Sequence, residues 1–231
     1  MQIETLIIWL IVGGVAGFLA GLIVKGYGLG LVGNIIAVLA VQPAQGEQRD
    51  LQAFDSIHVQ DAIRVDVTSG DQLLVDVSGP EADRVRTELK GGTLNISEIG
   101  RPWFGHDRQL NATVRITMPR VASLESAKGA TLIAVDVHGD DVTIAAATGG
   151  ELRISGNCQS ATVNVSMGGV IRANDFQCAR ATISASMGGD ARVFASATYD
   201  ASASMGGEVR VAGGGTHGRI STSMGGEISQ E

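Results

Sequence analysis

Ser166-Met167-Gly168-Gly169 is a stretch that the chain repeats unchanged at Ser186-Met187-Gly188-Gly189, Ser204-Met205-Gly206-Gly207 and Ser223-Met224-Gly225-Gly226. Looser copies stand upstream as Lys128-Gly129-Ala130 and Thr148-Gly149-Gly150. From Gly129 to Gly225 the steps between copies are 20, 19, 20, 18 and 19 residues. A near-constant period of this length is typical of repeat proteins, in which each repeat is one small unit stacked on its neighbours.

The residues on both sides of each Gly-Gly pair alternate between apolar and polar. In Ala181–Met187, for example, Ile183, Ala185 and Met187 share one face. After the pair, Ala191–Val193 places an arginine between two apolar residues. Alternation with a period of two indicates β-strands with one buried face. The pattern predicts an interior of Val, Ile, Ala and Met.

Two short strands per repeat, joined at a glycine corner, predict an all-β fold of the parallel β-helix type, a β-solenoid with about 19–20 residues per coil. Glycine suits such corners because it adopts positive φ and lets backbones approach closely. The predicted corner residues are Gly149, Gly150, Gly168, Gly169, Gly188, Gly189, Gly206, Gly207, Gly225 and Gly226.

Composition excludes one class of partner. The chain of 231 residues has a formal net charge of −7 and only 17 Lys plus Arg. Nucleic-acid binding needs a clustered basic surface, so we expect no nucleic-acid partner.

The N-terminal residues 1–44 are predicted to be a membrane anchor. Residues 5–24 are uncharged and mostly apolar, and 20 such residues span about 30 Å of hydrocarbon as a helix. A second apolar segment, 29–41, is short for a full span.

Two interpretations of this segment stay open. Residues 29–41 can be a second span, with Lys25 in a cytoplasmic turn; alternatively, the apolar region ends in a cleavage zone around residues 40–44. Either way the remainder is expected outside the cytoplasm, in the periplasm or at the cell surface.

The rest of the chain divides into a β-rich first part, 45–119, and the regular repeats, 120–231. Within the first part, Pro80–Leu89 is the one candidate for a soluble helix. It has proline at its first position and acidic residues in its first turn.

Two family resemblances follow from these segments. Ile7–Ile36, IIWLIVGGVAGFLAGLIVKGYGLGLVGNII, resembles the first half of the small transglycosylase-associated, stress-response membrane proteins. Phe54–Ile57, Gly91–Ser97, Val114–Pro119 and the glycine repeats resemble the putative auto-transporter adhesin, head GIN domain family, over about 51–231. The second resemblance implies an exported β-helical domain with an adhesion or surface role and supplies no catalytic residues.

Cys158 and Cys178 are 20 residues apart, which is one repeat. Adjacent coils would bring their Cα atoms to about 5 Å, a separation that a disulfide accepts. A disulfide and a pair of buried free thiols both fit the sequence.

Two columns of side chains are candidates for surface or interior roles. Thioethers can ligate copper(I), but the face shared with Ile183 favours core filling for the repeat methionines, and we expect no metal or other cofactor. Glutamate or aspartate stands two residues before most of the repeat arginines, which favours a self-neutralised solvated face over a ligand-binding stripe. The stripe consists of Arg153, Arg172, Arg192 and Arg210.

The sequence therefore predicts a bacterial, membrane-anchored, adhesin-like binding or structural module without catalytic activity. Its ligand would be a glycan or protein of the cell envelope, and its C-terminal coil could stack on a second molecule. The first alternative is a stress-response membrane protein that acts through its N-terminal segment. The second is a carbohydrate-active enzyme on a β-helix, which would need acidic and basic residues clustered on one face.

Overall fold

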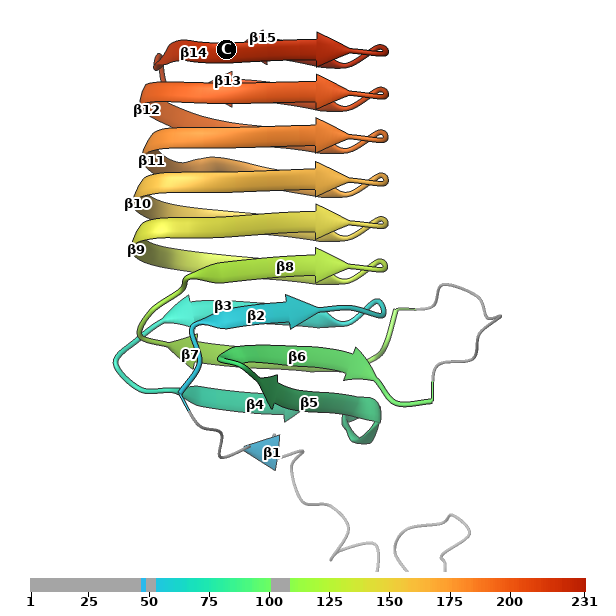
Figure 1. The fold of residues 1–231 in the computed structure, drawn as a ribbon. Coiled ribbons are helices and arrows are strands. Elements are labelled where there is room, and N and C mark those ends of the chain that lie inside the picture. The colour runs from blue at the N-terminus through green and yellow to red at the C-terminus, as the bar shows by residue number, and fades with distance from the viewer. Residues whose placement is uncertain (1–46, 49–52, 101–108) are drawn as a thin grey trace, which may run out of the picture. The chain divides into compact units, whose positions relative to one another are not determined.

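The structure is a computed structural model that describes residues 47–48, 53–100 and 109–231. Gly46–Glu231 forms one compact unit, and the predicted β-solenoid is confirmed in it (Figure 1). The first part contains β1 (Glu47–Gln48), β2 (Ser56–Val59), β3 (Arg64–Ser69), β4 (Leu74–Ser78), β5 (Val85–Lys90), β6 (Thr93–Glu98) and β7 (Thr113–Met118). The repeats contain β8 (Ser123–Ala127), β9 (Thr131–Ala147), β10 (Glu151–Ser166), β11 (Val170–Ser186), β12 (Asp190–Ser204), β13 (Glu208–Ala212), β14 (Thr216–Ser223) and β15 (Glu227–Gln230).

The strands β9 to β12 are long because each one covers both faces of a coil. The half that follows a glycine corner lies on one face, and the half that precedes the next corner lies on the other (Figure 1). Neighbouring coils pair in parallel, so that Glu151 lies beside Val170, which lies beside Asp190 and then Glu208. Residues 18 to 20 apart therefore lie over one another.

The space between the two faces is filled by the apolar members of the alternating pattern. Val163, Ile183, Val193 and Val209 are buried, as is the larger Phe176. Burial of these side chains is the main stabilising contribution, at about 25 cal/mol per Å² of apolar surface removed from water. The core is a continuous cluster that runs through the whole stack.

Each glycine corner is a two-residue turn of type I′. In the corner at Ser166, the Gly169 N–H donates to the Ser166 carbonyl oxygen at 2.9 Å, and both Met167 (φ 49°) and Gly168 (φ 72°) have positive φ. The Gly168 N–H donates to Met187 O of the next coil at 3.2 Å. The corners from Gly129 to Gly225 therefore form one hydrogen-bonded column.

The first corner ends in Ala130, but in the corners that end in Gly-Gly the last residue must be glycine for a different reason. A Cβ on Gly169 would lie 2.5 Å from the carbonyl oxygen of Ala146 on the adjacent coil, whereas a Cβ on Gly168 would meet nothing within 4 Å. Coils pack backbone against backbone at this point, and a side chain there would separate them.

The N-terminal end of the solenoid is closed by antiparallel strands. The coil formed by β2 and β3 lies between the coil of β8 and β9 and that of β6 and β7. Outside β6 and β7 lie β5 and β4, each antiparallel to its neighbour. Strand β5 carries Arg86, Glu88 and Lys90 on its solvent side, and charges of this kind discourage edge pairing.

The predicted helix at residues 80–89 is wrong. The chain forms a single 3-10 turn, η1 (Ala82–Arg84), and then strand β5 along β6. The proline and the early acidic residues fit the start of a helix, but Val85 is buried and Leu89 packs against the core from within β5. Tertiary pairing with β6 therefore overrides the local signal.

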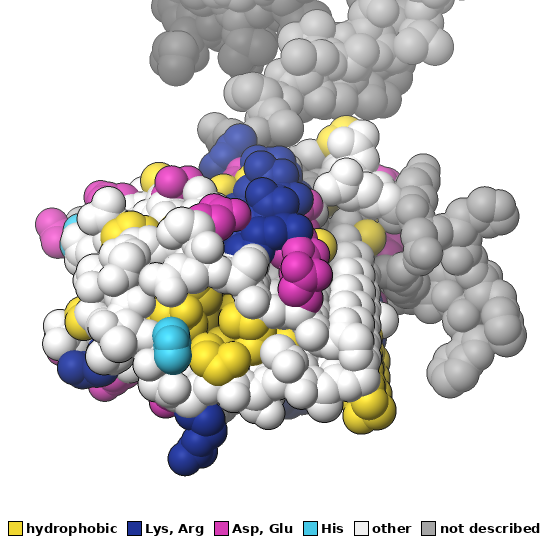
Figure 2. Space-filling view, turned by 90° about the horizontal axis from the view of Figure 1, so that it is seen from above, with side chains coloured by type: hydrophobic (Ala, Val, Ile, Leu, Met, Phe, Trp, Pro, Cys, Tyr) yellow, Lys and Arg dark blue, Asp and Glu magenta, His cyan; other side chains and the backbone are white. Residues whose placement is uncertain are grey.

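At the C-terminal end, β14 pairs only with β12, and β15 pairs only with β13, among the strands that the structure describes. Ile220 and Met224 are exposed there. Seen from this end, hydrophobic side chains lie open to solvent (Figure 2).

The predicted anchor, residues 1–44 with its segments 5–24 and 29–41, lies outside the described residues. Within the part that the structure describes, no helix is long and apolar enough to cross a bilayer.

Candidate binding surfaces

The four stripe arginines lie side by side on the face that follows the glycine corners. Arg153 pairs with Arg172, Arg172 with Arg192, and Arg192 with Arg210 as neighbours on consecutive coils. All four side chains point away from the core, because the residues on either side of each arginine are buried. Basic and acidic side chains lie next to one another on one flank in Figure 2.

Carboxylates of the adjacent column neutralise most of the stripe. Glu151 Oε1 lies 2.8 Å from Arg153 Nη2 and 3.6 Å from Arg172 Nε. Arg210 forms ion pairs with Asp190 and Glu208.

The exception in the stripe is Arg192. It is exposed, and among the described residues it has no ion-pair partner. At the neighbouring coil Val170 stands where the other coils carry an acid. Within the part of the chain that the structure describes, the stripe is therefore a largely neutral face in which Arg192 is the one unpaired cation.

Cys158 and Cys178 are brought together by the register of β10 and β11, in which they lie directly opposite each other. The structure joins them in a disulfide, with their Cα atoms 4.5 Å apart. Cys178 is buried, and Cys158 packs against the core. The bridge links two adjacent coils in the middle of β10 and β11, away from the glycine corners at the ends of these strands.

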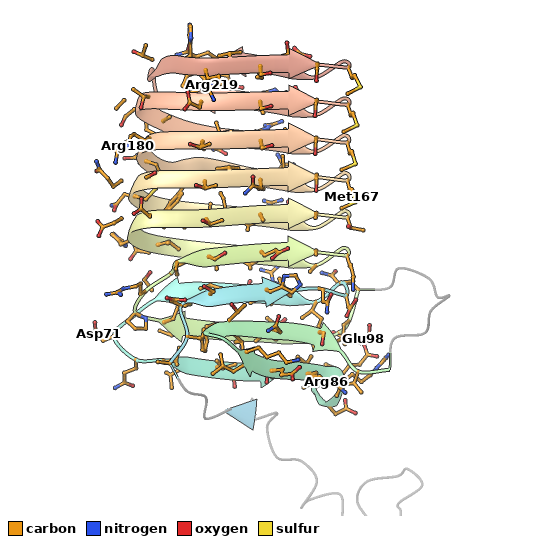
Figure 3. The ribbon with its side chains drawn as sticks, viewed as in Figure 1. Asp71, Arg86, Glu98, Met167, Arg180 and Arg219 are labelled. Atoms are coloured by element: carbon orange, nitrogen blue, oxygen red, sulfur yellow. A yellow bond between two sulfur atoms is a disulfide. The ribbon has the colours of Figure 1, made fainter. Side chains whose placement is uncertain are left out.

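The prediction that the repeat methionines fill the core is wrong. Met167, Met187, Met205 and Met224 are 50%, 46%, 46% and 73% exposed. Each occupies the first central position of its turn, where positive φ reverses the alternation and directs the side chain outward. The sulfur atoms line the corner edge, with Met167 labelled (Figure 3).

A polar hollow of about 670 Å³ lies on the opposite side of the coil from the methionines. Its polar side chains come from three segments that are distant in sequence and are Arg120, His138, Asp140, Asp141 and Asn157. All five of these residues are exposed, and the buried Val121 also lines the hollow. The His138 Nδ1–H donates to the carbonyl oxygen of Asp136 at 2.8 Å, which orients the ring.

The polar hollow was not predicted from the sequence. Its only signal is the run His138-Gly139-Asp140-Asp141 at the point where apolar alternation is interrupted. Asn157 joins that run because it lies opposite His138 in the register of β10 and β9, and Arg120 comes from the segment between β7 and β8.

A second hollow, of about 600 Å³, lies at the N-terminal end of the corner column and includes Asp61, Lys128 and Thr148 among its lining residues. Asp61 is buried and accepts a hydrogen bond from the Glu98 N–H at 3.4 Å. In the described ranges, no three His, Cys, Asp or Glu side chains are grouped so that they could hold a metal ion.

Comparison with known proteins places the chain by sequence and by fold. Residues 53–215 match the family described as "Putative auto-transporter adhesin, head GIN domain". That match begins after the residues predicted to form an anchor, so the resemblance of Ile7–Ile36 to transglycosylase-associated membrane proteins gains no support from it. No curated protein matches the chain.

Several solved structures are similar. A "putative adhesin" from Bacteroides fragilis superposes with a TM-score of 0.62 at 15% identity, covering 80% of this chain and 95% of its own, which shows a shared fold. A "putative lipid binding protein" from Parabacteroides distasonis gives 0.49 at 18% identity, with 81% and 96% covered. A "putative adhesin" from the same organism gives 0.47 at 16% identity, with 80% and 96% covered.

Proposed function

Since the chain belongs to the putative auto-transporter adhesin, head GIN domain family, we propose that it is a non-catalytic, adhesin-like binding module of the cell envelope. Its proposed ligand is a polar polymer of the cell envelope, specifically a glycan. The N-terminal segment holds it at a membrane, with the solenoid outside the cytoplasm.

The observation that supports this proposal best is the polar hollow of Arg120, His138, Asp140, Asp141 and Asn157. Carboxylate, amide, imidazole and guanidinium groups together offer both acceptors and donors, which a hydroxyl-rich glycan needs. Asn157 lies opposite His138, and the paired strands β9 and β10 also carry Asp140 and Asp141. These four side chains are therefore held on paired backbone, which lowers the entropy cost of ordering them when a ligand binds.

The arginine stripe is a second candidate contact surface. Its ion pairs favour a solvated scaffold face, but Arg192 is free to pair with an anionic group of a ligand. Pairing of an exposed cation is weak and salt-sensitive. We therefore assign the primary contact to the polar hollow.

Binding to immobilised envelope glycans, peptidoglycan and whole cells tests the assignment with the full-length chain. The variant Asp140→Asn/Asp141→Asn keeps the size of both side chains but removes two charges and replaces one acceptor oxygen of each carboxylate with an N–H donor group, and it should weaken binding by at least ~10-fold. The matched variant Asp175→Asn/Asp200→Asn changes the same residue types at exposed positions outside the hollow and should leave binding unchanged. Equal binding by both variants and the wild type would remove the hollow as the site, and Arg192→Ala then tests the stripe.

The export and anchoring parts of the proposal have separate support. The apolar residues 5–24 are long enough to span a bilayer, and disulfides such as Cys158–Cys178 persist in oxidising compartments. In cell fractionation, the full chain should stay with membranes after an alkaline wash, and a chain lacking residues 1–44 but carrying another export signal should be released. Retained adhesion by the released chain also separates this proposal from a stress-response function carried by the N-terminal segment.

Self-association through the C-terminal coil is a further part of the proposal. The outer edges of β14 and β15 have no strand partner among the described residues, and an unpaired edge can accept another strand. Light scattering of the full chain should show a mass that rises with concentration. A monomer throughout the range would exclude stacking.

A further inference from the structure

The four corner methionines form a feature that neither the family nor the proposed function explains. Met167, Met187, Met205 and Met224 occupy equivalent positions on consecutive coils, and we call them the methionine ladder. Each coil's corner is hydrogen-bonded to the next, for example Gly188 N–H to Met205 O at 3.1 Å. The ladder is therefore held on a fixed backbone spacing.

The turn does not require methionine at this position. Lys128 and Thr148 occupy the same place on the two preceding coils, with φ of 52° and 51°. A non-glycine residue is disfavoured at positive φ, and an exposed methionine also forgoes burial in the core. Four consecutive coils nevertheless place a thioether here, so the side chain itself is the feature to explain.

Thioether sulfur is a soft ligand that selects copper(I) among the biological metals. The backbone spacing of adjacent strands is about 4.8 Å, and the facing Cα atoms of Cys158 and Cys178 show 4.5 Å. Zinc–thiolate bonds are about 2.3 Å long. Two metal–sulfur bonds of that length in a line would place the two sulfur atoms at nearly the same separation as the backbones of adjacent coils. Flexible methionine side chains can close the small difference.

The surroundings favour a soft ion over a hard one. The residues next to the ladder in sequence are serine and glycine, which add no carboxylate. Both cysteines of the chain are in the disulfide, so no free thiol competes. We propose that neighbouring methionines of the ladder bind a soft monovalent cation, copper(I) or silver(I), in two-coordinate S–metal–S sites between coils.

Silver(I) is the probe for this proposal because it has the same soft d¹⁰ character and needs no reductant. The full-length chain, labelled at its methionine methyl groups, is titrated with silver nitrate in chloride-free buffer and followed by NMR. The methyl signals of the four ladder residues should shift, whereas that of Met118, which is buried, should not. Unshifted ladder signals, or a shift of Met118 together with loss of β-sheet circular dichroism, overturn the proposal.

Two double variants test whether adjacency matters. Met167→Leu/Met187→Leu leaves Met205 and Met224 on neighbouring coils, whereas Met187→Leu/Met224→Leu leaves Met167 and Met205 two coils apart. Both lose two sulfurs and keep the apolar bulk, but only the first retains a pair that can share one ion. Pre-placing a second ligand raises affinity by a large factor, so the second variant should bind silver ~100-fold more weakly than the first. Equal affinities would show adventitious binding to single thioethers or histidines and would overturn the shared sites.

Discussion

The packing of coils at the glycine corners leads to a prediction about two adjacent glycines. Gly169→Ala places a Cβ 2.5 Å from the Ala146 carbonyl oxygen and 2.6 Å from its carbon. Relief to ordinary contact needs a local separation of the coils by roughly 1 Å, and overpacking of this kind costs ~3 kcal/mol. The Cβ of Gly168→Ala would meet no atom within 4 Å. Its only cost is the strain of alanine at positive φ, which is ~1 kcal/mol.

Urea unfolding of the full-length chain, followed by far-UV circular dichroism, measures both changes. The midpoint for Gly169→Ala should fall by about three times as much as that for Gly168→Ala, with the slope of the transition unchanged. Equal losses, or a larger loss for Gly168→Ala, would show that backbone contact between coils does not determine the choice of glycine at the second position.

Other predictions concern the interior and the disulfide. Ile183→Ala opens a cavity in the core and should lower the free energy of unfolding by ~3 kcal/mol. Met187 is 46% exposed, so Met187→Ala should change the free energy of unfolding by less than ~0.5 kcal/mol. The same urea assay measures both variants, and a large effect at Met187 would contradict its outward orientation. Cys158→Ser/Cys178→Ser removes a cross-link across 20 residues and should lower the free energy of unfolding by ~3 kcal/mol. The comparison is with wild type, unfolded with and without reductant. A variant as stable as the oxidised wild type would show that the bridge contributes nothing to stability. Met205→Asn, at φ 48°, should raise the melting temperature slightly because asparagine tolerates positive φ better, and a decrease would show that the methionine stabilises its turn.

The solenoid was predictable because its signal is redundant. Every coil repeats the same alternation and the same glycine corner, so each repeat independently predicts the same pair of strands and the same turn. The register of Arg153, Arg172 and Arg192 follows directly from the period. The same period predicts that Cys158 and Cys178 lie next to each other on adjacent coils, although the sequence alone leaves their oxidation state open.

The errors occur where a local rule was extended beyond its element. Period-two alternation holds up to Ser186, but Met187 already belongs to the turn, and positive φ turns its side chain outward. Residues 80–89 carry helix signals with no repeat to correct them, and the pairing of β5 with β6 decides their structure. The polar hollow needs three segments of different coils to meet, which no local pattern contains.

The order of the N-terminal coils differs from the order of the sequence, and this has a consequence for biogenesis. Strands β2 and β3 lie between β6 and β7 on one side and β8 and β9 on the other. From β9 onward, each new strand pairs with the one synthesised about 20 residues earlier. Once the N-terminal coils have assembled, each later coil can therefore pair with a coil that is already folded as it emerges, and the loop-closure entropy lost in each step is small.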